Sequence, residues 1–199
     1  MICDYVKMQE IRKASKINIC GLMRGYATMI KVLFICHGNI CRSTMAQSVF
    51  AHLAAEANLA DYFEIDSAAT SREEIGNTPH YGTVRKLMEE NIPLIPHRAL
   101  QMTRNDYLYY DYLIGMDSAN IRNMTRIAGG TDSQDKIYKM LSFAGYEDTQ
   151  KFTGARDVAD PWYTGNFDET YEDVVAGCKG FLYYLQQKGN ISKEIEIPR

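Results

Sequence analysis

The sequence lacks the long apolar run that a membrane-spanning helix needs, and residues 1–28 contain no continuous apolar segment of the kind found in a secretory signal. It also lacks a surplus of positive charge, because 25 acidic side chains stand against 22 basic ones. Proteins that bind nucleic acid or anionic membranes usually carry a basic surface. We therefore expect neither a membrane nor a nucleic acid among its partners.

Cysteine is scarce as well, and the five that occur are odd in number and scattered: Cys3, Cys20, Cys36, Cys41 and Cys178. Such a set does not form a disulfide framework, which favours a reducing, cytoplasmic setting. A structural zinc site would need a second pair of cysteines or histidines at a usable distance from Cys36 and Cys41, and the sequence has none. We predict no metal and no cofactor.

The composition is that of one globular domain. The 199 residues are 46% hydrophobic and 24% charged, which suffices for a substantial core in a single unit. Residues 1–28 differ from the rest because they show no sustained apolar periodicity. We expect the folded domain to comprise residues 29–199, with residues 1–28 as an N-terminal extension outside it.

From residue 30 onward, short β-branched and aromatic runs alternate with helical periodicities. This alternation predicts an α/β fold in which helices cover both faces of a parallel sheet, giving three α/β/α layers. Residues 99–101 fit either a brief strand or a loop, and residues 145–165 fit a long loop. The predicted strands are 31–35, 63–68, 110–116 and 137–141, and the predicted helices are 78–91, 118–127, one starting at Ser43 and one running from Phe167 to a stop at Gly189.

The stretch CHGNICRS, residues 36–43, lies between the first strand and a helix for which Ser43 is a natural N-cap. A loop in this position directs backbone N–H groups inward, where an anion can bind. Cys36 and Arg42 stand at its two ends, and Gly38 allows a turn that a side chain would obstruct. The pattern predicts a phosphate site with a thiol at its floor and a guanidinium at its rim.

This loop suits nucleophilic attack on phosphorus. The loop amides, the positive end of the following helix, the Ser43 hydroxyl and the Arg42 cation all favour the reactive thiolate of Cys36. The forked guanidinium of Arg42 can hold two phosphate oxygens and gain strength as charge spreads over them in the transition state. The chemistry indicated is that of a cysteine-dependent phosphatase.

Such a reaction also needs an acid to protonate the leaving oxygen. The segment RDVADPWY offers Asp157 and Asp160. Pro161 biases Asp160 away from helical geometry and stiffens the turn. Trp162 and Tyr163 follow, and their aromatic surfaces could pack against a phenyl ring.

Together, CHGNICRS and the later DPW resemble the low-molecular-weight protein tyrosine phosphatase family, whose pattern is C-x-G-N-x-C-R-S followed by D-P-aromatic. The resemblance extends from about Met29 to Lys188. It implies a Rossmann-like phosphotyrosine phosphatase I fold, with a four-stranded parallel sheet in the order 2-1-3-4. It further implies hydrolysis of phosphotyrosine in proteins, or of small aryl phosphates, and inhibition by phosphate or vanadate.

The resemblance also assigns roles to residues. It implies that Cys36 is the nucleophile and forms a phosphocysteine, that Arg42 clamps the phosphate, and that Asp160 is the general acid and base. It implies a hydrogen-bond network that holds the loop, formed by Asn39 and Ser43 and supported by His97. The residues expected to contact substrate are His37, Gly38, Asn39, Ile40, Cys41, Ser43, Trp162 and Tyr163.

Two features of the loop surroundings stay open. The resemblance implies that Cys41 forms a reversible disulfide with Cys36, although Cys41 could simply fill the loop floor. Arg72, Glu73 and Glu74 stand where many family members carry an aromatic residue at the rim. We expect these acidic groups to disfavour strongly acidic peptides.

Three other functions remain as alternatives. An arsenate reductase of the same fold would need two further cysteines on a mobile segment, and none lies between Cys41 and Cys178. A protein-arginine phosphatase resembles this loop but has threonine in the position of Ile40, and the bulky isoleucine favours an aryl phosphate. A non-catalytic phosphate-binding or redox module would have no need of Asp160 and would form no phosphocysteine.

Overall fold

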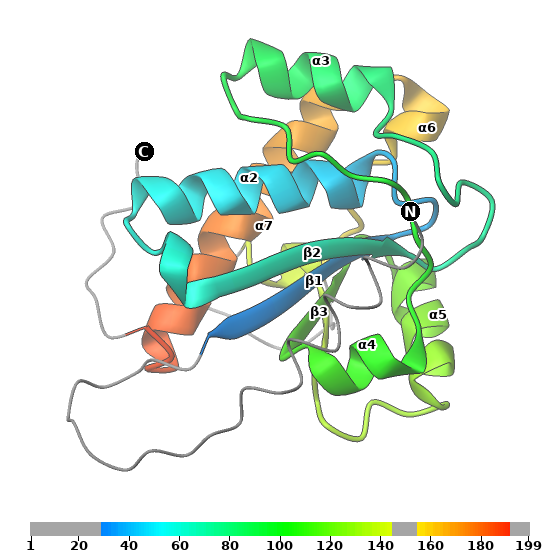
Figure 1. Ribbon diagram of the computed structural model, residues 1–199, viewed down its shortest axis with the longest axis vertical. Coiled ribbons are helices and arrows are strands. Elements are labelled where there is room, and N and C mark those ends of the chain that lie inside the picture. The colour runs from blue at the N-terminus through cyan, green and yellow to red at the C-terminus, as the bar shows by residue number, and fades with distance from the viewer. Residues whose placement is uncertain (1–28, 145–154, 192–199) are drawn as a thin grey trace, which may run out of the picture.

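The computed structural model describes residues 29–144 and 155–191. Its sheet has four parallel strands in the order β2-β1-β3-β4, which confirms the predicted fold class and strand order (Figure 1). The expectations for residues 1–28, and for the part of the predicted loop at 145–154, lie outside the described residues. The strands are β1 (Ile30–Cys36), β2 (Phe63–Ala69), β3 (Tyr112–Gly115) and β4 (Ile137–Lys139).

Helices cover both faces of this sheet, as the alternating pattern predicted (Figure 1). The α-helices are α2 (Arg42–Glu56), α3 (Tyr81–Glu89), α4 (Arg104–Tyr109), α5 (Ser118–Ala128), α6 (Pro161–Thr164) and α7 (Phe167–Gln187), with short 3-10 helices at Ala60–Tyr62 and Met140–Ser142. Within residues 29–144 and 155–191, no helix is long and apolar enough to cross a membrane.

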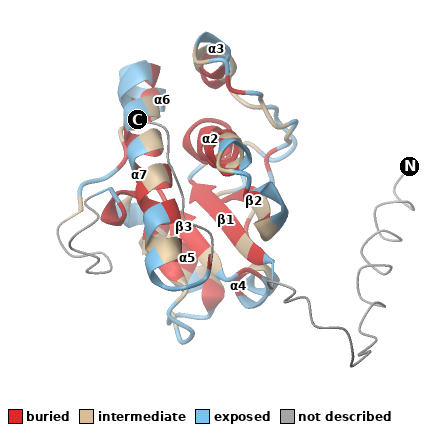
Figure 2. Cartoon of the chain, turned by 90° about the vertical axis from the view of Figure 1, so that its left-hand side faces the viewer, coloured by how far each residue is buried: buried red, intermediate tan, exposed pale blue. Residues whose placement is uncertain are grey.

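The central strand β1 feeds two hydrophobic cores because successive side chains on a strand point to opposite faces. Val32 and Phe34 pack into the core beneath α2 and α7, whereas Leu33 and Ile35 pack into the core beneath α4 and α5. All four side chains are at most 2% exposed. Figure 2 shows β1 and β3 as buried strands between the helical layers.

The contact between α2 and α7 fills the larger core with aromatic rings. The Phe181 ring on α7 lies 5.3 Å from Phe50 on α2, 5.1 Å from Tyr112 on β3 and 4.9 Å from Phe143, measured between ring centroids. Rings at these separations add attraction beyond the burial of their surface. The last helix is thereby fixed against the sheet and the first helix.

The helix after the loop begins one residue earlier than the sequence predicted. Arg42 is its first residue and Cys41 its N-cap, with no side-chain hydrogen bond to the cap. The prediction that Ser43 caps the helix was therefore wrong. The Ser43 hydroxyl is engaged elsewhere, because it lies 3.0 Å from the Cys36 Sγ and accepts a hydrogen bond from Asn39.

Two short helices escaped the sequence prediction. Helix α4 has a capping box in which Thr103 and Asp106 bond reciprocally to each other's backbone N–H, a signal present in the sequence as T-x-x-D. Helix α6 interrupts the predicted loop and has Asp160 as its N-cap. Both are too short for an apolar periodicity to reveal them.

Other boundaries moved by a few residues. Helix α3 starts at Tyr81, after Pro79 and an N-cap at His80, rather than at Thr78. Residues 99–101, left open between strand and loop, contribute only an isolated bridge between Gln101 and Ala69.

The carboxyl end of β1 is the switch point of the sheet. The chain passes from β1 to β2 on one side and later to β3 on the other, so loops from both sides meet beyond Cys36. Ligands of open α/β sheets bind at this point. The topology therefore places the CHGNICRS loop where a ligand site is expected.

Gly180 and Gly177 give a matched test of the α7 packing. A Cβ atom on Gly180 would lie 1.8 Å from the Phe143 carbonyl oxygen, whereas one on Gly177 would meet only the flexible Met140 side chain at 2.8 Å or more. We predict that Gly180→Ala lowers the free energy of unfolding by more than about 2 kcal/mol and that Gly177→Ala lowers it much less. Urea unfolding measures both, and equal effects would contradict the described packing.

Candidate active site

The loop from Cys36 to Arg42 surrounds a buried thiol. Cys36 is the last residue of β1 and is 3% exposed. Its Sγ accepts a hydrogen bond from the Asn39 N–H at 3.2 Å and lies 3.0 Å from the Ser43 Oγ. These two contacts fix the position of the sulfur at the floor of the loop.

Asn39 holds the loop in an unusual backbone conformation. Its φ of 60° lies in the left-handed region, and its side chain is fully buried. Its amide nitrogen donates to Ser43 Oγ at 3.0 Å and to Ser67 Oγ at 2.9 Å, and its oxygen accepts from the Leu100 N–H at 3.1 Å. The Asn39 side chain thus joins the loop to α2, to β2 and to the segment that contains Leu100.

His97 supplies a second hydrogen bond to this network. Its Nε2 lies 2.6 Å from Asn39 Oδ1, and an amide oxygen can only accept, so Nε2 donates. Burial lowers the pKa of His97 below its usual value, although the charge of Asp66 opposes the shift. The ring is therefore neutral near pH 7 and has a defined tautomer.

The network continues beyond the residues that the sequence analysis named. Ser67 Oγ donates to Gln47 Oε1 at 2.7 Å, which links strand β2 to helix α2 behind the loop. Ser67 and Gln47 are each at most 3% exposed. Nothing in their sequence context distinguishes them from ordinary strand and helix residues, since only the fold brings them together.

Arg42 lies between two carboxylates. Its Nη1 donates to Asp117 Oδ2 at 2.7 Å and its Nη2 pairs with Asp160 Oδ2 at 2.6 Å, while only 4% of its side chain is exposed. Burial by itself would lower the pKa of Arg42, but the nearby charges of Cys36, Asp160 and Asp117 raise it above its ordinary value. The guanidinium is a permanent cation in a fixed orientation.

Asp117 is a functional candidate that sequence reasoning missed. It stands at the carboxyl end of β3, and its Oδ1 accepts from the Asn120 N–H at 2.6 Å as the N-cap of α5. An aspartate just before a predicted helix is a recognisable N-cap signal. Its pairing with Arg42, 75 positions earlier, follows only from the strand order.

The two candidate acids occupy different environments. Asp160 lines the hollow above Cys36, and Asp157 does not. Asp157 Oδ1 accepts from Lys139 Nζ at 2.6 Å and from the Ser118 N–H at 3.0 Å. Burial would raise the pKa of Asp157, but these hydrogen bonds outweigh it and lower the pKa below its usual value.

The segment that carries Asp160 is anchored to helix α7. The buried Asp173 carboxylate pairs with Arg156 and accepts from the Ala159 N–H at 2.9 Å. Thr170 Oγ1 donates to the Ala159 carbonyl, also at 2.9 Å. These bonds to the residue immediately before Asp160 fix where its carboxylate can reach.

The hollow above Cys36 has a volume of about 130 Å³. The loop side chains His37, Ile40, Cys41 and Arg42, together with Gly38, contribute to its lining, as do Asp160, Trp162 and Tyr163 from the later segment. Asn39, Ser43 and His97 are not part of this lining, since they form the network behind the loop. The motif residues thus form two groups: one lines the hollow, and the other holds the loop from behind.

The rim of the hollow is acidic on one side. Glu73 and Glu74 belong to its lining, as their position in the sequence led us to expect, whereas Arg72 does not. Glu73 Oε2 lies 3.1 Å from His37 Nε2, and Glu74 accepts from the Asn77 amide at 2.6 Å. The mouth therefore presents carboxylates close to the aromatic surfaces of Trp162 and Tyr163.

Cys41 is a buried thiol beside Cys36. Burial, the charge of Cys36 and the charge of Asp160 raise the pKa of Cys41 to about 12. Both cysteines are free in the structure. Cys41 therefore stays protonated at neutral pH, and the disulfide with Cys36 stays a prediction.

Known proteins are similar to this chain in both sequence and fold. The sequence model of the family described as low molecular weight phosphotyrosine protein phosphatase matches residues 31–191. The chain belongs to this family. Among relatives of this phosphatase, the low molecular weight protein-tyrosine-phosphatase YfkJ of Bacillus subtilis is 38% identical over 160 residues, which are 80% of this chain and 98% of YfkJ. The human low molecular weight phosphotyrosine protein phosphatase is 37% identical over 154 residues, or 76% of this chain and 92% of the human one.

Solved structures agree with the sequence relatives. The crystal structure of YfkJ has a TM-score of 0.74 to this phosphatase, with 82% of this chain and 99% of YfkJ covered. The Drosophila arginine phosphatase has a TM-score of 0.68 at 26% identity, with 79% and 98% covered. The predicted family is confirmed, and so is the prediction that the chain is a phosphatase.

The environment of His97 predicts a pH dependence of stability. In the unfolded chain His97 takes up a proton near its usual pKa of 6.5, whereas the folded protein delays this uptake to lower pH. Between these two values the unfolded state holds more protons, so stability falls as the pH drops through this window. We expect the melting temperature of the wild type to fall further between about pH 7.5 and about pH 5.5 than that of His97→Gln, which cannot titrate. Parallel decreases in the two proteins would show that His97 does not contribute.

Proposed function

We propose that this phosphatase hydrolyses phosphotyrosine in proteins through a phosphocysteine formed on Cys36. In the first step the Cys36 thiolate attacks phosphorus, and the bond from phosphorus to the phenolic oxygen breaks. Asp160, in its acid form, donates its proton to that departing oxygen. The strongest support for this mechanism is that Cys36, Arg42 and Asp160 line the same hollow.

Arg42 binds the phosphoryl group in both steps. The substrate dianion replaces the Asp160 carboxylate at Nη2, while Asp117 keeps its hydrogen bond to Nη1 and holds the plane of the guanidinium. In its protonated form Asp160 carries no charge and can lie beside the bound dianion. As negative charge spreads over the equatorial oxygens in the transition state, the Arg42 fork stabilises it.

In the second step the roles of the acid and the nucleophile reverse. Asp160, now a carboxylate, takes a proton from a water molecule, and the oxygen of that water attacks phosphorus. The bond from sulfur to phosphorus breaks, inorganic phosphate is released and Cys36 leaves as a thiolate. The Asn39 N–H donates to the sulfur, and the Ser43 hydroxyl at 3.0 Å can donate to the departing thiolate, so both groups make the sulfur a better leaving group.

An aryl phosphate is the substrate class that the lining favours. Trp162 and Tyr163 are 59% and 85% exposed at the mouth and can pack against a phenyl ring. Relatives at 37–38% identity are named phosphotyrosine phosphatases. The likeness to an arginine phosphatase makes phosphoarginine the second candidate, against which the bulk of Ile40 in the lining argues.

The same chemistry suggests inhibitors and a location. Phosphate and vanadate carry the charge that the loop binds, so we expect both to compete with substrate. A mechanism that needs a free thiolate requires reducing conditions, and the three cysteines in the described residues are unpaired. A cytoplasmic location fits this requirement.

Replacing the nucleophile tests the mechanism directly. We predict that Cys36→Ser lowers turnover of p-nitrophenyl phosphate by more than about a thousandfold and still binds vanadate, because the loop and Arg42 remain. Acid quenching of the wild type during turnover of radiolabelled substrate should trap a phosphocysteine that the variant does not form. A variant that keeps wild-type rates would disprove the role of Cys36. Parallel rates with phosphotyrosine and phosphoarginine peptides distinguish the two substrate candidates.

Leaving-group dependence tests the acid. We predict that Asp160→Ala slows phosphotyrosine hydrolysis by roughly a hundredfold or more and slows an activated ester such as 2,4-dinitrophenyl phosphate far less, because a good leaving group needs no proton. Asp157→Asn is the matched control, since its side chain is held by Lys139 outside the hollow. If Asp157→Asn showed the leaving-group dependence and Asp160→Ala did not, the assignment would be reversed.

A further inference from the structure

The hollow above Cys36 is one of three that follow one another over the surface. A second, of about 250 Å³, lies between α3 and α6 and shares Trp162 with the first. A third, of about 720 Å³, extends along α3 and shares Tyr81 and Arg85 with the second. Neighbouring hollows that share lining residues therefore extend from the phosphate site past α6 and along α3.

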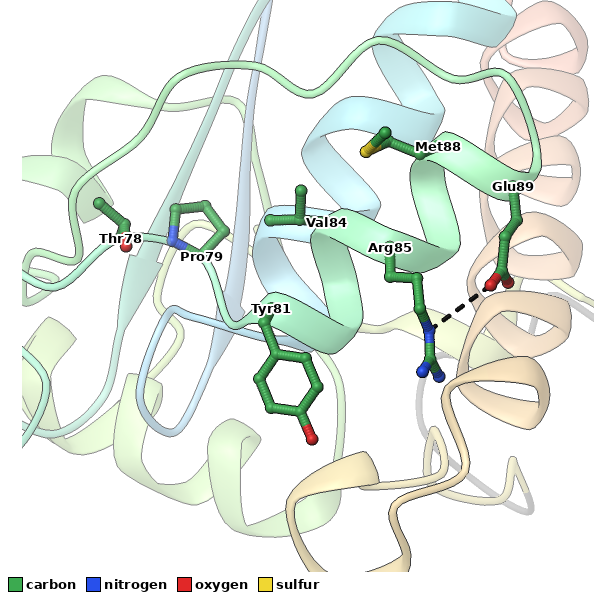
Figure 3. Close-up of a pocket in the computed structure, with 7 residues that line it drawn as sticks. All are labelled: Thr78, Pro79, Tyr81, Val84, Arg85, Met88 and Glu89. Atoms are coloured by element: carbon green, nitrogen blue, oxygen red, sulfur yellow. Dashed lines mark ion pairs between the residues drawn. The ribbon is translucent and has the colours of Figure 1, made fainter.

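The third hollow, here called the α3 groove, is mainly apolar. Val84 and Met88 extend toward one edge of the helix face that lines it, Tyr81 and Arg85 extend toward the opposite edge, and Pro79 lies just before the helix (Figure 3). Met88 is 71% exposed and Tyr81 is 74% exposed. The main charges in it, Arg85 and Glu89, face each other in an ion pair at 3.5 Å. The groove thus offers apolar surface to water without a net charge of its own.

The groove has a fixed position relative to the phosphate loop. The His80 N–H, directly before α3, donates to the Ile40 carbonyl at 2.8 Å, and Thr83 Oγ1 donates to the Cys41 carbonyl at 3.4 Å. The His80 ring stacks on Phe167 at the start of α7 at 5.3 Å, nearly parallel to it. Helix α3 is therefore tied both to the loop and to the helix that follows the acid segment.

The dimensions suit an extended polypeptide. Helix α3 from Tyr81 to Glu89 is about 12 Å long at a rise of 1.5 Å per residue. An extended chain covers this length with about four residues. About four residues of a substrate chain that passes Trp162 would therefore lie along α3.

We propose that the α3 groove binds the polypeptide on one side of the phosphotyrosine and selects protein substrates with an apolar side chain a few residues from it. The inference rests on the proposed phosphotyrosine phosphatase function and adds a determinant of specificity to it. Because the groove adjoins the catalytic hollow, we infer that the substrate's own chain occupies it. Because the groove is mainly apolar and has no net charge, we infer that it binds an apolar side chain of that chain. Small aryl phosphates carry no flanking chain and do not reach the groove.

Three phosphotyrosine peptides of equal length test this proposal. One carries leucine about three residues before the phosphotyrosine, one carries it about three residues after, and one has serine at both positions. We expect the wild type to prefer one leucine peptide over the serine peptide by about fivefold or more in kcat/KM, the gain from burying part of an apolar side chain. Equal values for all three peptides would overturn the proposal.

Variants locate the effect. Met88→Ser and Tyr81→Ser should each remove most of the leucine preference while changing kcat/KM for p-nitrophenyl phosphate by less than about twofold. Leu108→Ser is the matched control, because Leu108 is a 56% exposed side chain on α4, which covers the other face of the sheet (Figure 1). A preference that survives both groove variants, or that Leu108→Ser also removes, would refute the α3 groove as its source. Turnover of p-nitrophenyl phosphate separates this proposal from the catalytic mechanism. Cys36→Ser should abolish that turnover, whereas the groove variants should leave it unchanged.

Discussion

The buried side chain of Asn39 is the constraint on which the phosphate loop depends. A residue other than glycine in the left-handed region costs conformational energy, and the surroundings must compensate for it. Here the compensation comes from hydrogen bonds to Ser43, Ser67, His97 and the Leu100 backbone. The loop is thereby shaped before any ligand arrives. Because the polar groups of this network lie in a region of low dielectric, each depends on its partners more strongly than it would in water.

Charge in the site is balanced around one cation. Arg42 is buried and paired with Asp117 and Asp160, and the Cys36 sulfur lies among donors at the floor of the same hollow. A buried cation without partners would cost several kcal/mol, so the free enzyme needs these carboxylates. The two carboxylates have unequal duties. Asp117 also caps α5 and belongs to the frame, whereas Asp160 stands on a separate segment and, in the proposed mechanism, gives up its place at Arg42 to the substrate.

Much of the fold and of the site could be predicted from the sequence, and there are physical reasons why the rest could not. The alternating strand and helix periods predicted a parallel α/β sheet. The resemblance of CHGNICRS and the late DPW to a known family implied its strand order and the joint site of Cys36, Arg42 and Asp160. Ser43 was wrongly expected to cap the helix as well as to belong to the loop network, because a serine at the start of a helix suits both uses. Asp117 and Gln47 were missed because their partners lie far away in the sequence and are brought near only by the packing of strands and helices.

The bonds that connect Asp173 and Thr170 to the residue before Asp160 have a consequence for how the protein matures during synthesis. The phosphate loop lies near the beginning of the domain, and the helix that orients the acid lies at its end. During synthesis Cys36 is therefore made long before the contacts that position Asp160 can form. The position of Asp160 beside the phosphate loop therefore depends on the docking of the final helix, so the hollow takes its shape only in the completed domain.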